Sequence, residues 1–148
     1  MLHIALYQPD IPQNVGAAMR LCACLGIPLD IIEPCGFPWD MKKIRQSGMD
    51  YVNKLDLNRH DSWKAFKKTY PDRRFVLMTT KSSEPYTDFQ FNENDILIAG
   101  RESAGVPLDI HQSIENRITI PMKGEARSLN IINATAMITG EALRQIGL

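Results

Sequence analysis

The stretch Arg117-Ile-Thr-Ile-Pro-Met122, followed by Arg127-Ser-Leu-Asn-Ile-Ile-Asn-Ala134, decides the fold. An apolar segment with the pattern of a strand ends at Pro121, and a polar loop follows it. Ser128 and Asn130 then open a long helical pattern, because serine and asparagine favour the start of a helix. A strand, a loop and a helix N-terminus in this order place backbone donors and acceptors around a pocket. The sequence therefore predicts a ligand site at this junction.

Outward from this junction, apolar runs of strand length alternate with helical patterns along the chain. We expect strands at 2–7, 29–33, 51–55, 75–79, 95–99 and 118–120, a first helix that follows Pro12 and ends at Gly26, and further helices at 40–48, 62–70 and 128–147. Gly26 is the expected end of the first helix, and Asp61 is the expected N-cap of the third. This alternation predicts a three-layer α/β fold, with a mostly parallel sheet and helices on both faces. We expect residues 1–148 to form a single domain.

Composition narrows the class of protein. Hydrophobic residues make up 44% of the 148 residues and charged residues 23%, as in ordinary globular proteins. Lys and Arg together number 17, as do Asp and Glu, whereas a protein that coats nucleic acid nonspecifically is strongly basic. No apolar run approaches the roughly 20 residues that span a bilayer. We therefore expect a cytoplasmic protein with no membrane and no DNA partner.

The common catalytic motifs are missing from the sequence. The spacing of Gly100 and Gly105 mimics the start of a phosphate-binding loop, but Val106-Pro107 stands where Lys-Ser/Thr is required. Cys22 and Cys24 have no second pair of ligands at zinc spacing. There is also no dinucleotide fingerprint and no nucleophile elbow. We therefore expect no bound metal.

Three loops follow expected strands, at 78–83, 100–107 and 121–128. The carboxyl ends of parallel strands meet at one edge of a sheet, and ligands of open α/β folds bind there. Loops with few charged groups at their strand ends suit an adenosyl group held by main-chain hydrogen bonds. On the residues alone, ordinary turns of an α/β fold explain these loops equally well.

Three motifs in order identify a family. The segments Asn14–Arg20, Gly100–Pro107 and Ile120–Asn130 resemble the motifs of the SPOUT family of RNA ribose methyltransferases. The opening 6–14 and the loop Ile32-Glu-Pro-Cys-Gly-Phe37 are similar to the subgroup that 2′-O-methylates the tRNA wobble nucleotide, cytidine or uridine 34. The resemblance implies S-adenosylmethionine as methyl donor, tRNA as substrate and a C-terminal trefoil knot.

The resemblance also implies roles for individual residues. The implied cofactor contacts are Met78, Thr79, Gly100, Ile120, Met122, Ser128 and Leu129. Arg20 is the implied catalytic residue, while Asn14, Glu102 and Asn130 shape the site. Because an arginine stays protonated, we expect Arg20 to fix the RNA phosphate and stabilise the forming alkoxide rather than act as a base.

Departures from the family pattern leave alternatives open. The family often has Pro where this chain has Arg101, Arg where it has Ala104, and an aromatic residue where it has Gly140. One alternative is methylation at another tRNA position or in ribosomal RNA. Another is an RNA-binding relative without catalysis.

The last helix predicts an oligomer. Its apolar residues lie on two faces, one with Leu129, Ile132, Ala136 and Leu143 and another with Ile131, Ala134, Ile138 and Ala142. A helix that is apolar over so much of its circumference is deeply buried or packs against a second chain. The family is dimeric, and we expect a homodimer built partly on this helix.

Overall fold

A computed structural model describes residues 1–48, 54–125 and 129–147. Within these residues, six strands form one sheet in the order β3-β2-β1-β5-β4-β6, and every neighbouring pair is parallel. The strands are β1 (His3–Tyr7), β2 (Leu29–Ile32), β3 (Leu57–His60), β4 (Phe75–Met78), β5 (Ile96–Ala99) and β6 (Asn116–Ile118). The sheet is therefore wholly parallel.

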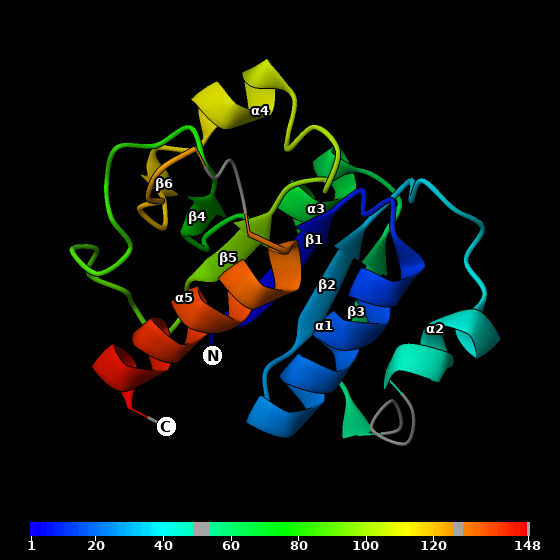
Figure 1. Cartoon of the computed structure of the whole chain (residues 1–148). Helices are drawn as coiled ribbons and strands as arrows, with labels where there is room; N and C mark the ends of the chain where they lie inside the picture. Colours follow the sequence, from blue (N-terminus) through cyan, green and yellow to red (C-terminus); the bar gives the residue numbers. More distant parts are fainter. Residues whose placement is uncertain (49–53, 126–128, 148) are drawn as a thin grey trace.

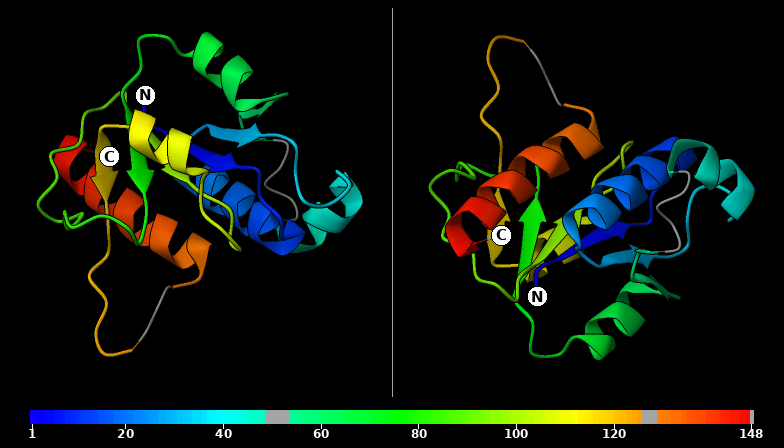
Figure 2. Two further views of the ribbon diagram at one scale, coloured as in Figure 1. Left: turned by 90° about the horizontal axis from the view of Figure 1, so that it is seen from above. Right: turned by 90° about the horizontal axis from the view of Figure 1, so that it is seen from below.

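Helices cover both faces of the sheet (Figures 1 and 2). They are α1 (Pro12–Leu25), α2 (Met41–Gly48), α3 (Trp63–Thr69), α4 (Leu108–Ser113) and α5 (Ile131–Ile146). Figure 2 shows α1 and α5 on one side of the sheet and α3 on the other. The predicted three-layer α/β fold is confirmed.

The core consists of two apolar layers, one on each face of the sheet. Ile4, Leu6 and Leu97 belong to the layer under α1 and α5. The alternate strand residues, Ala5 and Ile98 among them, belong to the layer that includes Phe66 of α3 and Ile110 of α4. Since both faces are buried, the central strands read as continuous apolar runs.

The ends of the helices follow local capping chemistry. Gly26 adopts a left-handed backbone (φ 67°) after α1, as predicted for the end of that helix. The predicted N-cap Asp61 is wrong, because Ser62 caps α3 and its hydroxyl accepts from Ala65 N at 3.0 Å. Asn130 caps α5, so the described part of the last helix begins at Ile131; Ser128 lies outside the described residues.

Two predicted strands are displaced. The segment at 51–55 is wrong in its described part, since residues 54 and 55 belong to no strand, and 51–53 lie outside the described residues. The edge strand β3 forms further along, at Leu57–His60. The last strand ends at Ile118 rather than Ile120, because Thr119 leaves the ladder for an isolated bridge with Pro85. The short helix α4 was not predicted.

One polar group lies within the second apolar layer. Asp30 of β2 is fully buried and accepts from His3 Nδ1, His60 Nε2 and Tyr70 Oη, each at 2.7 Å. Burial alone would raise the pKa of Asp30, but these three hydrogen bonds hold it below its usual value. The cluster thereby joins β1, β2, β3 and the end of α3.

Candidate active site at the carboxyl edge of the sheet

A cavity of about 660 Å³ lies where β4, β5 and β6 end and α5 begins. The three loops predicted to form a ligand site, at 78–83, 100–107 and 121–128, all contribute described residues to its wall. This volume falls within the range of pockets that bind small molecules and cofactors. The cavity is therefore a candidate active site.

The predicted cofactor residues line this cavity, except for Ser128, which lies outside the described residues. They are Met78, Thr79, Gly100, Ile120, Met122 and Leu129. Leu77, Ile118 and Ile138 add an apolar floor from the sheet and from α5. An apolar floor with exposed backbone above it can hold a flat ring and present hydrogen-bonding groups to its edge.

The loop after β5 is closed by its own backbone. Arg101 and Gly105 exchange two hydrogen bonds, of 3.0 and 2.9 Å, and Gly105 has a left-handed backbone (φ 65°). A Cβ atom on Gly100 would lie only 2.6 Å from Gly105 C, so glycine is required there. The close approach holds Glu102 at the wall of the cavity.

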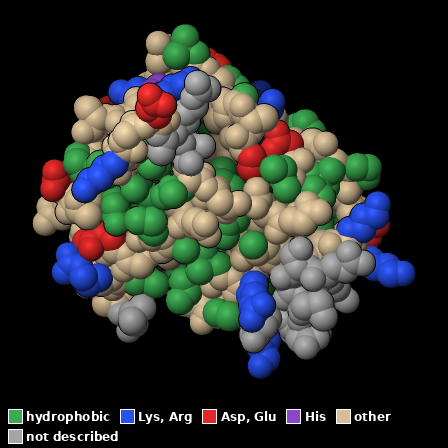
Figure 3. All heavy atoms as spheres, viewed as in Figure 1, with side chains coloured by type: hydrophobic (Ala, Val, Ile, Leu, Met, Phe, Trp, Pro, Cys, Tyr) green, Lys and Arg blue, Asp and Glu red, His purple; other side chains and the backbone are tan. Residues whose placement is uncertain are grey.

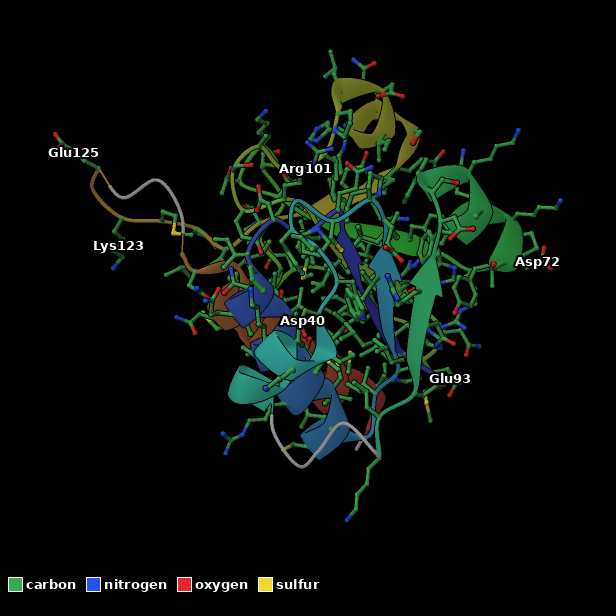
Figure 4. The ribbon with its side chains drawn as sticks, turned by 90° about the vertical axis from the view of Figure 1, so that its right-hand side faces the viewer. Asp40, Asp72, Glu93, Arg101, Lys123 and Glu125 are labelled. Carbon is green, nitrogen blue, oxygen red and sulfur yellow. The ribbon has the colours of Figure 1, made fainter. Side chains whose placement is uncertain are left out.

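Arg101, a departure from the family pattern, packs inside this site. Its guanidinium donates to the Gln8 side chain and lies 5.6 Å from the centre of the Tyr7 ring. Burial raises the pKa of Tyr7, although the charge of Arg101 opposes that shift. Figure 4 shows Arg101 at the end of the sheet nearest α4, while Glu93 lies at the opposite end.

A directed chain of hydrogen bonds connects three predicted site residues. Asn130 Oδ1 accepts two backbone N–H groups of α5, at 2.9 and 3.2 Å, so its amide must present Nδ2 on the other side. Asn130 Nδ2 donates to Asn14 Oδ1 (3.4 Å), and Asn14 Nδ2 donates to Glu102 Oε1 (3.1 Å). The cap of α5 thereby sets the orientation of Asn14 and leaves Glu102 as the acceptor.

Sequence reasoning missed Asp10, which belongs to this chain of contacts. Its backbone N–H donates to Glu102 Oε2 at 3.0 Å, and its carboxylate accepts from Ser103 Oγ. Burial and the interaction with the Asp10 carboxyl group raise the pKa of Glu102, whereas the same interaction between the two carboxyl groups holds the pKa of Asp10 low. Asp10 stands within the quoted opening 6–14, but nothing in that motif indicates a partner 92 residues away.

The predicted catalytic residue Arg20 lies elsewhere. It occupies an exposed position on α1 and is not among the described residues that line the cavity. The structure therefore brings Asn14, Glu102 and Asn130 together at the cavity but does not bring Arg20 to it.

Basic groups also line the cavity. Lys81 and His111 contribute to the wall, and Arg117 donates to the backbone oxygen of His111 at 3.3 Å. Burial, followed by the charges of Arg117 and Lys81, lowers the pKa of His111. The cavity wall thus carries a carboxylate, Glu102, as well as basic side chains.

Two further features, a cluster of metal ligands and a membrane-spanning helix, are absent from the described residues. Residues 1–48, 54–125 and 129–147 contain no group of three or more His, Cys, Asp or Glu side chains placed to hold a metal ion. The same ranges contain no helix that is both long and apolar enough to cross a bilayer.

The chain is similar to RNA methyltransferases of known sequence. The profile of the SpoU rRNA methylase family matches residues 1–140. A protein of Beijerinckia indica named tRNA (cytidine(34)-2′-O)-methyltransferase is 54% identical over 146 residues, which cover 97% of this chain and 91% of the relative.

Solved structures agree with this match. One, described as giving insights into the 2-OH methylation of C/U34 on tRNA, is 38% identical with a TM-score of 0.93, covering 98% of this chain and 95% of that one. A SpoU methyltransferase of Streptomyces viridochromogenes, solved with its cofactor AdoMet, is 26% identical with a TM-score of 0.82. That match covers 98% of this chain and 60% of the Streptomyces chain.

Proposed function

Because this chain belongs to the SpoU rRNA methylase family, we propose that it 2′-O-methylates the wobble nucleotide, cytidine or uridine 34, of tRNA. The observation that carries the proposal is the full-length match to the Beijerinckia relative and to the structure concerned with C/U34. The two matches agree on both the reaction and the nucleotide. A tRNA substrate also supports the cytoplasmic location expected from the sequence.

The methyl donor of the proposal is S-adenosylmethionine. The cavity fits it in size, and a lining of apolar residues and glycines suits an adenosyl group. Met78, Gly100 and Ile120 would hold the group, with Thr79, Met122 and Leu129 beside them; Ser128, which lies outside the described residues, is the fourth implied contact. When bound, it supplies an electrophilic sulfonium methyl group, and we propose that no metal takes part.

The protein's contribution is orientation and electrostatics. The ribose oxygen must approach the methyl carbon in line, and a preorganised site supplies most of the acceleration for such a step. Asn14, Glu102 and Asn130 are fixed by one another and by the cap of α5, so they lose little freedom during the reaction. We assign to Arg20 the fixing of the RNA phosphate and the stabilisation of charge on the ribose oxygen.

A homodimer is part of the proposal. The helices α1 and α5 lie side by side on one face of the sheet, and Figure 3 shows apolar side chains over α5 (Figures 1 and 3). Met137 and Leu129 are 44% and 39% exposed there. Arg20 also lies on an exposed position of α1, so a dimer through these helices can bring it towards the partner's cavity. The trefoil knot stays a prediction from the resemblance.

Mapping of ribose methylation in tRNA from a strain that lacks this protein tests the proposal. We expect the 2′-O-methyl group to be missing at position 34 and to return with the wild-type gene. Loss at another tRNA position or in ribosomal RNA would favour the first alternative. Unchanged methylation everywhere would favour an RNA-binding protein without catalysis.

A further inference from the structure

The carboxylate of Asp10 lies beside Glu102 but is not among the residues to which the proposed reaction gives a role. Its Oδ2 accepts from Ser103, but its Oδ1 is buried without a hydrogen-bond partner among the described residues. The position of Asp10 is nevertheless tightly fixed: a Cβ on Gly36 would lie 2.6 Å from Asp10 Cβ, and Gly36 N donates to Pro9 O at 2.9 Å. A buried acceptor that is held in place without a partner requires an explanation.

The neighbouring carboxyl group of Glu102 explains why Asp10 Oδ1 is held in place without a partner. Glu102 Oε1 accepts from Asn14 and Oε2 from the Asp10 N–H, and each carboxylate oxygen has a second acceptor site. Glu102 lines the cavity, whereas Asp10 is not among the described residues that line it. Two carboxyl groups in contact resist simultaneous ionisation and tend to share one proton. A proton on Glu102 could therefore be donated to the unpartnered Asp10 Oδ1.

We propose, on the basis of the methyl transfer above, that Glu102 accepts the proton of the ribose 2′-hydroxyl and that Asp10 is its positioning residue. The ribose oxygen forms a bond to the methyl carbon while the carbon–sulfur bond breaks and its electron pair stays on sulfur. The O–H electron pair remains on the ribose oxygen, and the proton moves to Glu102. Glu102 then donates to Asp10 Oδ1, and the proton leaves to solvent when the product dissociates.

The surrounding groups favour Glu102 in this role. Asn14 and Asn130 are neutral amides that cannot take a proton, and Arg101 beside Glu102 is a cation bonded to Gln8. Burial, with the charge of Glu33 adding to it, raises the pKa of Cys35, whose thiol also feels the charge of Glu102, to about 11, so this thiol stays neutral. The raised pKa of Glu102 brings its basicity nearer to neutral pH, where a general base works best.

His111 is the competing base, because it also lines the cavity. It lies near Lys81 and Arg117, and burial, followed by the charges of these two residues, lowers its pKa. A variant of His111 therefore separates the two assignments.

Two measurements test the proposal: the pH profile of single-turnover methyl transfer, and carbon NMR titration of the Glu102 carboxyl in the ligand-free protein. We expect Glu102→Gln to lower the rate about a hundredfold or more and to remove the acidic limb of the profile. Asp10→Asn removes a neighbouring negative charge, so the midpoint of that limb and the NMR pKa of Glu102 should both fall. Asp10→Glu should restore them, and the remote control Glu93→Gln should change neither.

Three results would overturn the proposal. They are a Glu102→Gln rate within threefold of wild type, a Glu102 pKa that does not respond to Asp10→Asn, and loss of the acidic limb in His111→Gln. Thermal melting identifies a variant that has not folded, and Asp10→Glu then supplies the test. If the wild type transfers no methyl group, the proposed function fails, whereas the NMR response of the carboxyl pair is still measured independently.

Discussion

At the scale of single residues, Asn130 combines two tasks in one amide. Its oxygen caps α5 and its nitrogen donates to Asn14, which in turn positions Glu102. The two tasks can be separated by substitution, because a serine also caps a helix but has no amide to donate to Asn14. Substitutions of Asn130 therefore show whether the chain of hydrogen bonds contributes to turnover as well as to the stability of the helix.

We expect Asn130→Ala to lower the free energy of unfolding by about 1 kcal/mol and the melting temperature by about 2–4 °C. Asn130→Ser should melt within a degree or so of wild type, since the cap is kept. Both variants should lose turnover, because neither orients Asn14. Thermal denaturation and single-turnover transfer measure the two effects, and wild-type turnover in Asn130→Ser would show that the chain only stabilises the fold.

Arg20 supports a second prediction. If it fixes the RNA phosphate and stabilises charge on the ribose oxygen, Arg20→Ala should lower turnover by roughly a hundredfold or more. Arg20→Lys should recover little, since a point charge cannot replace the planar guanidinium. Cofactor affinity, measured by calorimetry with a chelator present, should stay near wild type in both variants. Near-normal turnover in Arg20→Ala would remove this residue from the reaction.

Motifs predicted the site better than they predicted its internal contacts. Asn14, Glu102 and Asn130 were named from three separate motifs and lie together at one cavity. Asp10 and His111 were missed because a carboxylate in a proline-containing loop and a histidine in a short helix carry no pattern of their own. Their importance depends on neighbours that the fold brings from distant parts of the chain.

At the scale of elements, prediction succeeded where burial creates a pattern. The central strands β1, β4 and β5 are covered on both faces and read as apolar runs. The edge strand β3, with sequence Leu57-Asn-Arg-His60, has no such run and is held by pairing with β2 and by the bond between His60 and Asp30. The helix α4 is only 6 residues long, too short to show a helical period.

The Asp30 cluster predicts how these strands respond to mutation and pH. Asp30→Ala leaves three donors without this partner, two of them on the buried side chains of His3 and His60, and should lower the free energy of unfolding by about 3 kcal/mol or more. The pKa of Asp30 is depressed in the fold, so its contribution is present above its unfolded pKa of about 3.9. That contribution is lost as the pH falls through the folded pKa.

Chemical denaturation of wild type and Asp30→Ala at several pH values measures this contribution. The difference between the two proteins should be largest near neutral pH and should shrink as the pH falls below about 4. A difference that does not change over that range would mean that the ionised carboxylate is not the stabilising form.

At the scale of the whole molecule, the proposed homodimer depends on the outer face of α5. Ile138 belongs to one of the two apolar faces of the last helix, so the sequence pattern suggests it as a position at which to test the dimer. In the structure it is only 1% exposed and lines the cavity. A charge there would be buried and would unfold the chain. Met137, 44% exposed on the same helix, is the position at which a charge can act on an interface without entering the core.

We expect the wild type to be a dimer at micromolar concentration and Met137→Asp to be a folded monomer, because an unpaired charge would be buried in the contact. Lys64→Asp, on the exposed surface of α3 across the sheet, should remain dimeric. Light scattering with circular dichroism distinguishes dissociation from unfolding. A monomeric wild type, or a Met137→Asp variant that stays dimeric, would remove α5 from the interface.

The central claim, methyl transfer to the ribose of nucleotide 34, is tested most directly with the purified protein, labelled S-adenosylmethionine and tRNA that differs at one atom. The matched substrates are a tRNA with a complete ribose at position 34 and the same tRNA with a 2′-deoxyribose there. We predict that label enters the first as a 2′-O-methyl group on cytidine or uridine 34 and does not enter the second. Equal labelling of both substrates, or no labelling of either by a folded protein, would contradict the account.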